Sequence, residues 1–356
     1  MNSAAAFPVR AAAVFLDLRR GSGDDTLRVT TPGREERYMI KRILSRFFSL
    51  FFPHDFTPGG PPLFPDEPEQ LPEEGFWQAL PHWPPNVYSG AIAHAAAVLS
   101  EGAETGDGGD ITAKYRACGF SPDCIAVGNY RRNTGSAPDV GSGKPSLAFC
   151  IGHRPLEEDT SLLVLTARGA VNLWELYRAL TTEAVCGFSG LSVYDVIDEF
   201  ANELQWGLER YLALHRELSG QRLLLLLTGH SLGGAAVNLL AARLLVCPPT
   251  WTEQPEIFCY TFGAIDVFDA SKAESSPVSK GFEAIHNIYN EQDDFGPIGH
   301  GLYGIPLLMA KGNHKSGKFG QLYTFDADYR GRRKSSSPNH DMCVYRAALR
   351  HPLERH

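Results

Sequence analysis

The stretch Arg222–Leu245, RLLLLLTGHSLGGAAVNLLAARLL, decides the fold of this chain. Its five consecutive leucines predict a strand covered on both faces, because a half-exposed strand would alternate apolar and polar residues. The pentapeptide Gly229-His230-Ser231-Leu232-Gly233 follows and fits G-x-S-x-G. The next residues predict a helix over Leu232–Val246, which Cys247-Pro248-Pro249 ends. Ser231 is therefore expected on a tight turn between a buried strand and a helix.

A serine at such a turn takes a strained backbone conformation, and its hydroxyl stands clear of the chain. Gly229 and Gly233 remove the Cβ atoms that would otherwise collide in the turn. The helix N-terminus brings its positive end toward negative charge that develops on a substrate carbonyl oxygen. The pattern predicts Ser231 as a nucleophile, and a glycine-rich turn without chemistry is the alternative.

Strands and helices alternate on both sides of this unit. We predict further strands at Leu147–Gly152, Ser161–Thr166, Ile257–Phe262 and Ala284–Tyr289, and helices at Ala91–Ser100 and Leu191–Leu218. This alternation is typical of an α/β fold in which helices flank a mostly parallel sheet.

The bulk composition excludes some classes of function. A net charge of -8 over 356 residues does not favour nucleic-acid binding, which usually shows a basic stripe. The seven cysteines are odd in number, form no C-x-x-C, and lie partly in apolar runs, so we expect mainly buried free thiols. No H-E-x-x-H motif, EF-hand loop or Cys/His cluster occurs along the sequence, and we expect no metal or other cofactor.

The first 85 residues differ in texture from the rest. Arg37–Phe52 predicts a basic amphipathic helix, which either lies on a membrane surface or packs on its own domain. Residues 53–85 are rich in proline and predict an extended arm without regular helix or strand. We therefore divide the chain into an N-terminal extension, 1–85, and an α/β domain, 86–356.

The start of the chain does not read as a standard export signal, because Asp17 and Arg19-Arg20 interrupt its apolar run. No run reaches the roughly 18 apolar residues that a membrane span needs. We expect a cytoplasmic protein or one exported by a non-standard route.

Six motifs together resemble the class 3 lipases, the family of the fungal triacylglycerol lipases and their bacterial relatives. They cover most of residues 86–350. The motifs are Thr228–Gly234 (TGHSLGG), Leu165–Ala170 (LTARGA), Val185–Phe188 (VCGF), Tyr260–Ala264 (YTFGA), Asn290–Pro297 (NEQDDFGP) and His340–Tyr345 (HDMCVY).

The resemblance implies an α/β-hydrolase fold and a catalytic triad, in the chain order Ser, acid, His. His340 is the expected base, since His230 points away across the turn, and His286 and His314 are expected to be structural or surface residues. The acid is Asp294 if its spacing to Pro297 decides, and Asp293 if the spacing from Asn290 decides; we select Asp294.

The same resemblance places the oxyanion hole at the backbone N–H groups of Leu232 and Ala170. Ala170 stands where the family has Thr or Ser, so a side-chain donor is missing. The segment that follows implies a lid, with an ordinary amphipathic helix as the alternative. The apolar residues of this lid candidate are Trp174, Leu176, Tyr177 and Leu180.

The leading hypothesis is thus a serine hydrolase that cleaves acyl esters of triacylglycerols or phospholipids, with a lipid substrate or lipid interface as its partner. A small-acyl esterase without interfacial preference is one alternative. Another is a catalytically weak hydrolase fold that serves as a binding or toxin-like module, which the Ala170 departure favours.

Overall fold

A computed structural model of the chain describes residues 71–72, 75–104, 108–130, 147–170, 184–188, 190–248, 255–269, 280–293, 316–328, 338–351 and 353–355. The chain divides into two units, Met1–Pro53 and His54–His356, and every described residue belongs to the second. The predicted basic helix at Arg37–Phe52 lies outside the described residues.

An eight-stranded sheet forms the centre of the second unit, with the strand order β1-β2-β3-β6-β7-β9-β11-β12. Its middle strands β3, β6, β7, β9 and β11 are parallel, and β1, β2 and β12 at the edges are antiparallel. The α/β-hydrolase-like fold with a mostly parallel sheet is therefore confirmed. The strands are β1 (Ile125–Gly128), β2 (Phe149–Glu157), β3 (Thr160–Ala167), β6 (Arg222–His230), β7 (Glu256–Phe262), β9 (Ile285–Asn290), β11 (Gln321–Phe325) and β12 (Glu354–Arg355).

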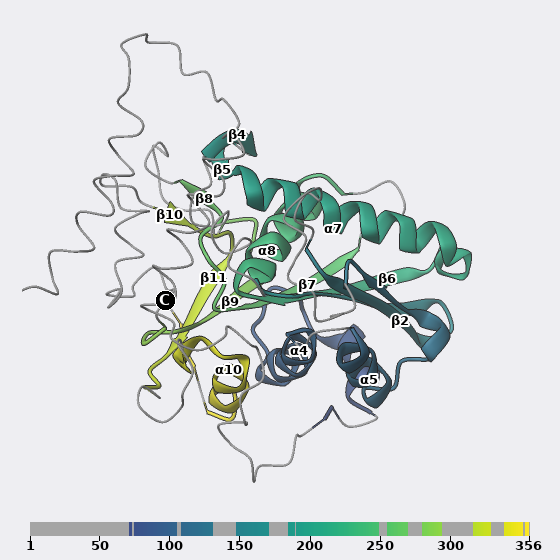
Figure 1. Ribbon diagram of the computed structural model, residues 1–356. Helices are drawn as coiled ribbons and strands as arrows, with labels where there is room; N and C mark the ends of the chain where they lie inside the picture. Colours follow the sequence, from purple (N-terminus) through teal and green to yellow (C-terminus); the bar gives the residue numbers. More distant parts are fainter. Residues whose placement is uncertain are drawn as a thin grey trace, which may run out of the picture. The chain divides into compact units, whose positions relative to one another are not determined.

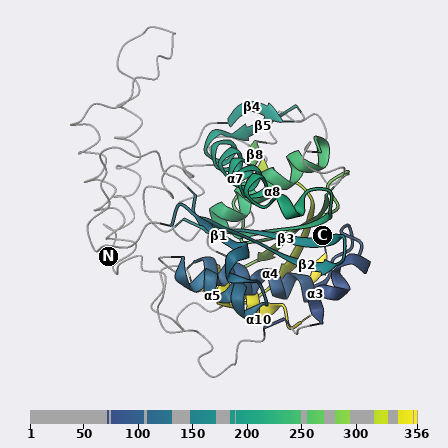
Figure 2. The ribbon, with the colours of Figure 1, turned by 90° about the vertical axis from the view of Figure 1, so that its right-hand side faces the viewer.

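Helices cover both faces of this sheet. Figures 1 and 2 show α7 (Asp195–Leu214) and α8 (Ser231–Val246) on one face, and α4 (Gly90–Ala103), α5 (Gly109–Ala117) and α10 (Met342–Ala348) on the other. Each layer encloses its own apolar core, one around Leu225 and Leu239 and the other around Leu226 and Leu99. The leucines of β6 alternate between the two cores, which explains why the run has no polar residue.

The same unit contains a second sheet of four strands, in the order β10-β8-β5-β4. It consists of β4 (Ala184–Phe188), β5 (Leu191–Tyr194), β8 (Phe268–Asp269) and β10 (Ser316–Gly317). The helix predicted from Leu191 therefore begins too early, because residues 191–194 pair with β4 and β8 instead. The predicted helix also extends too far: α7 ends at Leu214, and residues 216–218 form a separate 3-10 turn, η3 (Arg216–Leu218).

The proline-rich arm is not wholly irregular, contrary to the prediction. The short helix α3 (Phe76–Ala79) and a 3-10 turn, η1 (Leu80–His82), lie within it, and Pro81 stands in the first turn of η1, where proline is tolerated. The side chains of Trp77 and Leu80 are buried in the α4-side core. This part of the arm therefore packs on the α/β unit.

The prediction of buried thiols is confirmed for four described cysteines, whose side chains are buried: Cys118, Cys150, Cys259 and Cys343. A fifth, Cys247, is free but exposed. Within the described ranges, none of the helices combines the length and the apolar character that crossing a membrane requires.

Candidate active site

Ser231 lies where β6 ends and α8 begins, with a left-handed φ of 53°. A non-glycine residue in this region is strained, as the sequence predicts for the turn. Gly233 fits the turn because a Cβ atom there would lie 2.4 Å from the Arg168 carbonyl oxygen and 2.6 Å from that of Ala167. The glycine therefore lets the start of α8 approach the end of β3.

His340 ends the 3-10 turn η5 (Pro338–His340), immediately before α10. Its Nδ1–H donates a hydrogen bond of 2.7 Å to Oδ2 of Asp293, which is 1% exposed and follows β9. The His340 ring lies 4.5 Å, centroid to centroid, from the ring of His230, the neighbour of Ser231. The structure thus brings the predicted base and a carboxylate together beside the turn that carries Ser231.

Asp294, the acid selected from the sequence, lies outside the described residues. The carboxylate against His340 is that of Asp293, the alternative left open by the spacing from Asn290. We therefore assign the acid role to Asp293 in the proposal below.

Asn290 at the end of β9 holds the loop that carries His340. Its Nδ2 group donates to the Asn339 carbonyl oxygen at 3.1 Å, and Asn339 Nδ2 donates to the Gln292 carbonyl oxygen at 3.0 Å. An ion pair of 2.5 Å between Arg346 and Glu101 ties α10 to α4. These bonds fix the position of His340 relative to the sheet.

The Tyr345 hydroxyl donates a second hydrogen bond to Oδ2 of Asp293. Gly263, with a φ of 50°, leaves room for this pair, since a Cβ atom there would lie 2.7 Å from the Tyr345 hydroxyl and 3.1 Å from Asp293 Oδ2. A buried carboxylate needs hydrogen-bond donors to replace the water that it loses. The pattern of residues 340–345 contains this tyrosine, but sequence analysis assigned it no role.

Glu104, at the end of α4, is a second carboxylate near the base that sequence analysis missed. Its Oε1 accepts a hydrogen bond of 2.9 Å from the Gly169 N–H and lies 3.2 Å from His230 Nδ1. Burial opposes its ionisation, but His230, the Gly169 N–H and Arg168 outweigh burial and lower the pKa of Glu104. Glu104 is therefore a fixed negative charge beside His230 and His340.

Burial disfavours the charged form of His340, but nearby carboxylates overcome this effect and raise its pKa above the ordinary 6.5. Asp293 contributes most through its charge and its hydrogen bond, followed by Glu104 and Asp341. The carboxylates that raise this pKa also stabilise the imidazolium that a general base forms when it takes a proton.

We expect Glu104→Gln to move the acidic limb of the kcat/KM profile to lower pH. Only neutral His340 accepts a proton, so activity falls as the pH drops through its pKa. Removing the Glu104 charge lowers that pKa, while the glutamine oxygen still accepts from Gly169. The measurement is a pH–rate profile on a soluble ester, with Glu158→Gln as the exposed control. An unchanged limb in Glu104→Gln would contradict the electrostatic role.

The expected oxyanion donors lie at the N-terminus of α8 and just after the end of β3. Leu232 is in the first turn of α8, where backbone N–H groups lack intrahelical acceptors, and Ala170 follows β3, partly buried. His286 is buried in β9, and its Nε2–H donates to the Pro85 carbonyl oxygen, so it is structural as expected. The lid candidate and His314 lie outside the described residues.

Comparisons with known proteins agree with the motifs. Residues 166–295, a little over a third of the chain, match the family model described as Lipase (class 3). The matched segment includes Ser231 and Asp293 and ends before His340. The resemblance to the class 3 lipases is thus confirmed for this segment.

Among solved structures, the chain is similar to Rhizomucor miehei triacylglyceride lipase, with 22% identity, a TM-score of 0.35, and coverage of 50% of this chain and 61% of that lipase. It is also similar to the lipase of Rhizopus microsporus var. chinensis (13% identity, TM-score 0.39, 79% of this chain and 83% of that chain). For lipase II of Rhizopus niveus the identity is 14% and the TM-score 0.35, and the match covers 69% of this chain and 82% of that chain. None of the curated proteins matches the chain.

Proposed function

We propose that this chain is a serine hydrolase that cleaves the carboxylic ester bonds of lipids through an acyl-enzyme on Ser231. The observation that carries the proposal is the pairing of His340 with the buried Asp293 beside a strained serine turn. The class 3 lipase segment at residues 166–295 supports an ester substrate with an apolar acyl group.

In the proposed mechanism, Ser231 Oγ attacks the ester carbonyl carbon while His340 Nε2 takes the hydroxyl proton. The tetrahedral intermediate then expels the alcohol, which takes that proton from His340. In the second half, water attacks the acyl-enzyme and loses a proton to His340; His340 then returns this proton to Ser231 Oγ as the bond to the acyl group breaks and the fatty acid leaves. Asp293 orients the imidazole and stabilises its charged form throughout.

The backbone N–H groups of Leu232 and Ala170 would bind the oxyanion in both tetrahedral intermediates. Each group lies in a segment that the close approach of α8 to the end of β3 holds in place. The helix dipole of α8 adds positive potential at its N-terminus. This arrangement has two backbone donors, whereas the family resemblance implies a side-chain donor at position 170 as well.

We expect Ala170→Thr to raise kcat if the added hydroxyl reaches the oxyanion. A donor realised only in the transition state contributes to kcat, and removing one typically costs about 2.7–4 kcal/mol. A gain of about tenfold corresponds to only 1.4 kcal/mol. The measurement is kcat on a soluble ester, with thermal stability checked in parallel. An equal or lower kcat would mean that the backbone donors complete the hole, and the weak-hydrolase alternative would lose its main support.

Two assays together test the proposed function. An organophosphonate reagent labels only an activated serine, so stoichiometric labelling of Ser231 separates an enzyme from a binding module. Hydrolysis of p-nitrophenyl esters from C2 to C16, beside a phospholipid, then defines the substrate. We expect labelling and a preference for long acyl chains.

The outcomes distinguish the three hypotheses. A preference for C2–C4 esters without any increase at a lipid interface would replace the lipase proposal with a small-acyl esterase. Absence of labelling in folded protein would favour the binding or toxin-like module. Hydrolysis of phospholipid but not of triacylglycerol would narrow the substrate class.

A further inference from the structure

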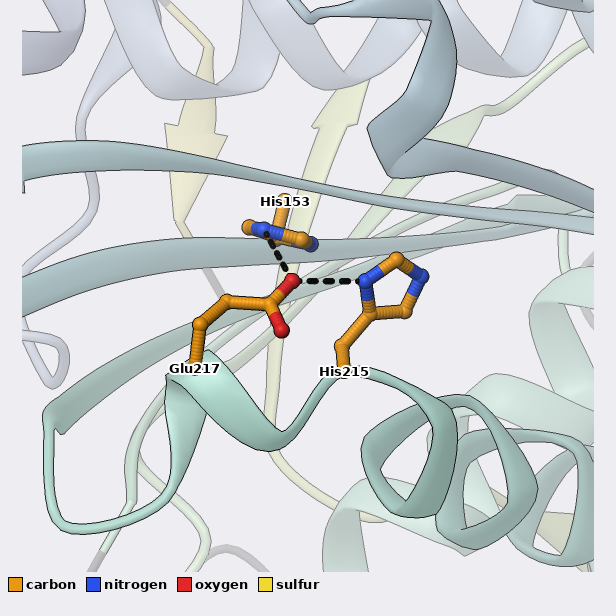
Figure 3. A group of neighbouring side chains, drawn as sticks. All are labelled: His153, His215 and Glu217. Atoms are coloured by element: carbon orange, nitrogen blue, oxygen red, sulfur yellow. Dashed lines mark hydrogen bonds and ion pairs between the residues drawn. The ribbon is translucent and has the colours of Figure 1, made fainter.

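Three side chains that can ligate a metal converge at a place unrelated to the proposed triad. His153 lies on β2, His215 caps the C-terminus of α7, and Glu217 lies in the turn η3. Figure 3 shows both imidazoles directed toward the Glu217 carboxylate, and the three ligand atoms all lie within 4.8 Å of one another. Glu217 Oε1 is 2.8 Å from His215 Nδ1 and 3.6 Å from His153 Nε2.

The local chain geometry produces this convergence. α7 ends at Leu214, and His215, with φ -103° and ψ 71°, leaves the helical conformation and turns the chain into η3. The turn directs His215 and Glu217, two residues apart, toward the same side (Figure 3). Sequence analysis found no metal motif because His153 comes from a strand about 60 residues earlier and has no fixed spacing to the pair.

A hydrogen-bond chain orients His153. Its Nδ1–H donates to the Tyr211 hydroxyl at 2.8 Å, and that hydroxyl donates to the Cys124 carbonyl oxygen at 2.6 Å. With Nδ1 protonated, the lone pair of the neutral ring is on Nε2, which faces Glu217. A bond of this kind on the second ring nitrogen is usual for metal-binding histidines, because it fixes the tautomer and the ring orientation.

The cluster combines buried and accessible groups. His153 is 5% exposed, His215 20% and Glu217 58%, so one side opens to solvent. The rings also pack together, with 4.8 Å between the centroids of His153 and His215 and 4.3 Å between those of His215 and Tyr211.

We propose that His153, His215 and Glu217 bind a divalent transition-metal ion of the zinc class. Two imidazole nitrogens and one carboxylate oxygen suit this ion, and the exposed side leaves a coordination position for water. Ligands of a tetrahedral zinc ion at 2.0–2.1 Å lie about 3.3 Å from one another. The separations of 2.8 and 3.6 Å to Glu217 bracket that value, and the two imidazole nitrogens lie within 4.8 Å of each other, so binding requires side-chain rotations that bring the three ligand atoms to a common distance.

The site has a structural role in this proposal. His153 is in register with Leu163 of β3, which is in register with Leu225 of β6. Ser231 lies six residues farther along the chain from Leu225, about 20 Å at strand spacing. A bound ion would join β2 to the segment between α7 and β6, and would stabilise the folded chain because the unfolded chain has no preformed site.

The test uses untagged full-length protein, stripped with EDTA and titrated with ZnCl₂ by calorimetry and thermal melting. His215→Ala and Glu217→Gln remove one ligand each, and His351→Ala removes an exposed histidine outside the cluster as the matched control. We expect one zinc per chain and a Tm increase of several degrees for the wild type and for His351→Ala. In the two cluster variants, we expect at least tenfold weaker binding and a smaller Tm increase.

Cobalt(II) gives a second readout that does not depend on stability. Four- or five-coordinate cobalt bound by imidazole and carboxylate absorbs visible light far more strongly than the hydrated ion, so the wild type should develop these bands and His215→Ala should not. Equal zinc affinity and equal spectra in wild type and His215→Ala would overturn the proposal, as would no zinc binding by the wild type. In the latter case the cluster is a hydrogen-bonded stack of aromatic rings.

Discussion

Ser231→Ala should abolish ester hydrolysis, with kcat lowered on the order of 10⁵- to 10⁶-fold. Loss of the nucleophile leaves only binding and oxyanion stabilisation, which give a small residual rate. The fold should be retained, because the strained left-handed conformation of residue 231 affects alanine and serine alike. The measurement is kcat on a p-nitrophenyl ester, with circular dichroism and a thermal melt. Unchanged turnover in a folded Ser231→Ala protein would remove the central claim.

Ser231→Gly is the matched control for backbone strain. Glycine removes the Cβ atom that makes a left-handed conformation unfavourable by about 1–2 kcal/mol, while its greater freedom in the unfolded chain offsets about 0.5–1 kcal/mol. Ser231→Gly should therefore be as inactive as Ser231→Ala but equally or more stable. A Ser231→Gly protein that melts well below Ser231→Ala would show that the turn is not strained.

The sequence predicts those parts of the site whose conformation depends on residues close together along the chain. The nucleophile turn is such a part, because Gly229, Ser231 and Gly233 lie within five residues, and the buried β6 and the helix α8 directly flank them. The strand and helix periods on either side are local signals. The selection of His340 from the sequence rests on the order of triad residues along the chain, which is a property of the fold; in the structure this histidine contacts Asp293.

The remaining features depend on contacts between distant segments. Residues 191–194 continue an apolar pattern that suits a helix, yet they pair with β4 and β8, and pairing partners are not visible in a local pattern. Glu104 reaches Gly169 across 65 residues, so no local pattern relates it to the site. Asp293 and Asp294 differ by one position, and local spacing does not choose between them; the structure shows the Asp293 carboxylate against His340.

We expect Asp293→Asn to lower kcat by about 10⁴-fold, because an amide in place of the orienting acid typically has an effect of this size. An asparagine Nδ2 group facing His340 Nδ1 would favour the tautomer with the proton on Nε2, which cannot accept the Ser231 proton. Because the Tyr345 hydroxyl contacts the same atom, Oδ2, it would have to accept a hydrogen bond from the asparagine Nδ2 in this orientation instead of donating one. The measurement is kcat on a soluble ester, together with the pH profile and a melt to separate catalysis from folding.

Asp294→Asn is the matched variant that decides the register. Asp293 is the carboxylate bonded to both His340 and Tyr345, so Asp294→Asn should retain most of the wild-type activity and its acidic limb. Asp293→Asn should also lower the pKa of His340, since the Asp293 charge contributes most to raising it. Its small residual activity should therefore persist to lower pH than that of the wild type.

A large loss in Asp294→Asn with little change in Asp293→Asn would return the acid role to Asp294, the residue selected from its spacing to Pro297. Comparable losses in both would mean that the turn after β9 requires both carboxylates to keep its conformation.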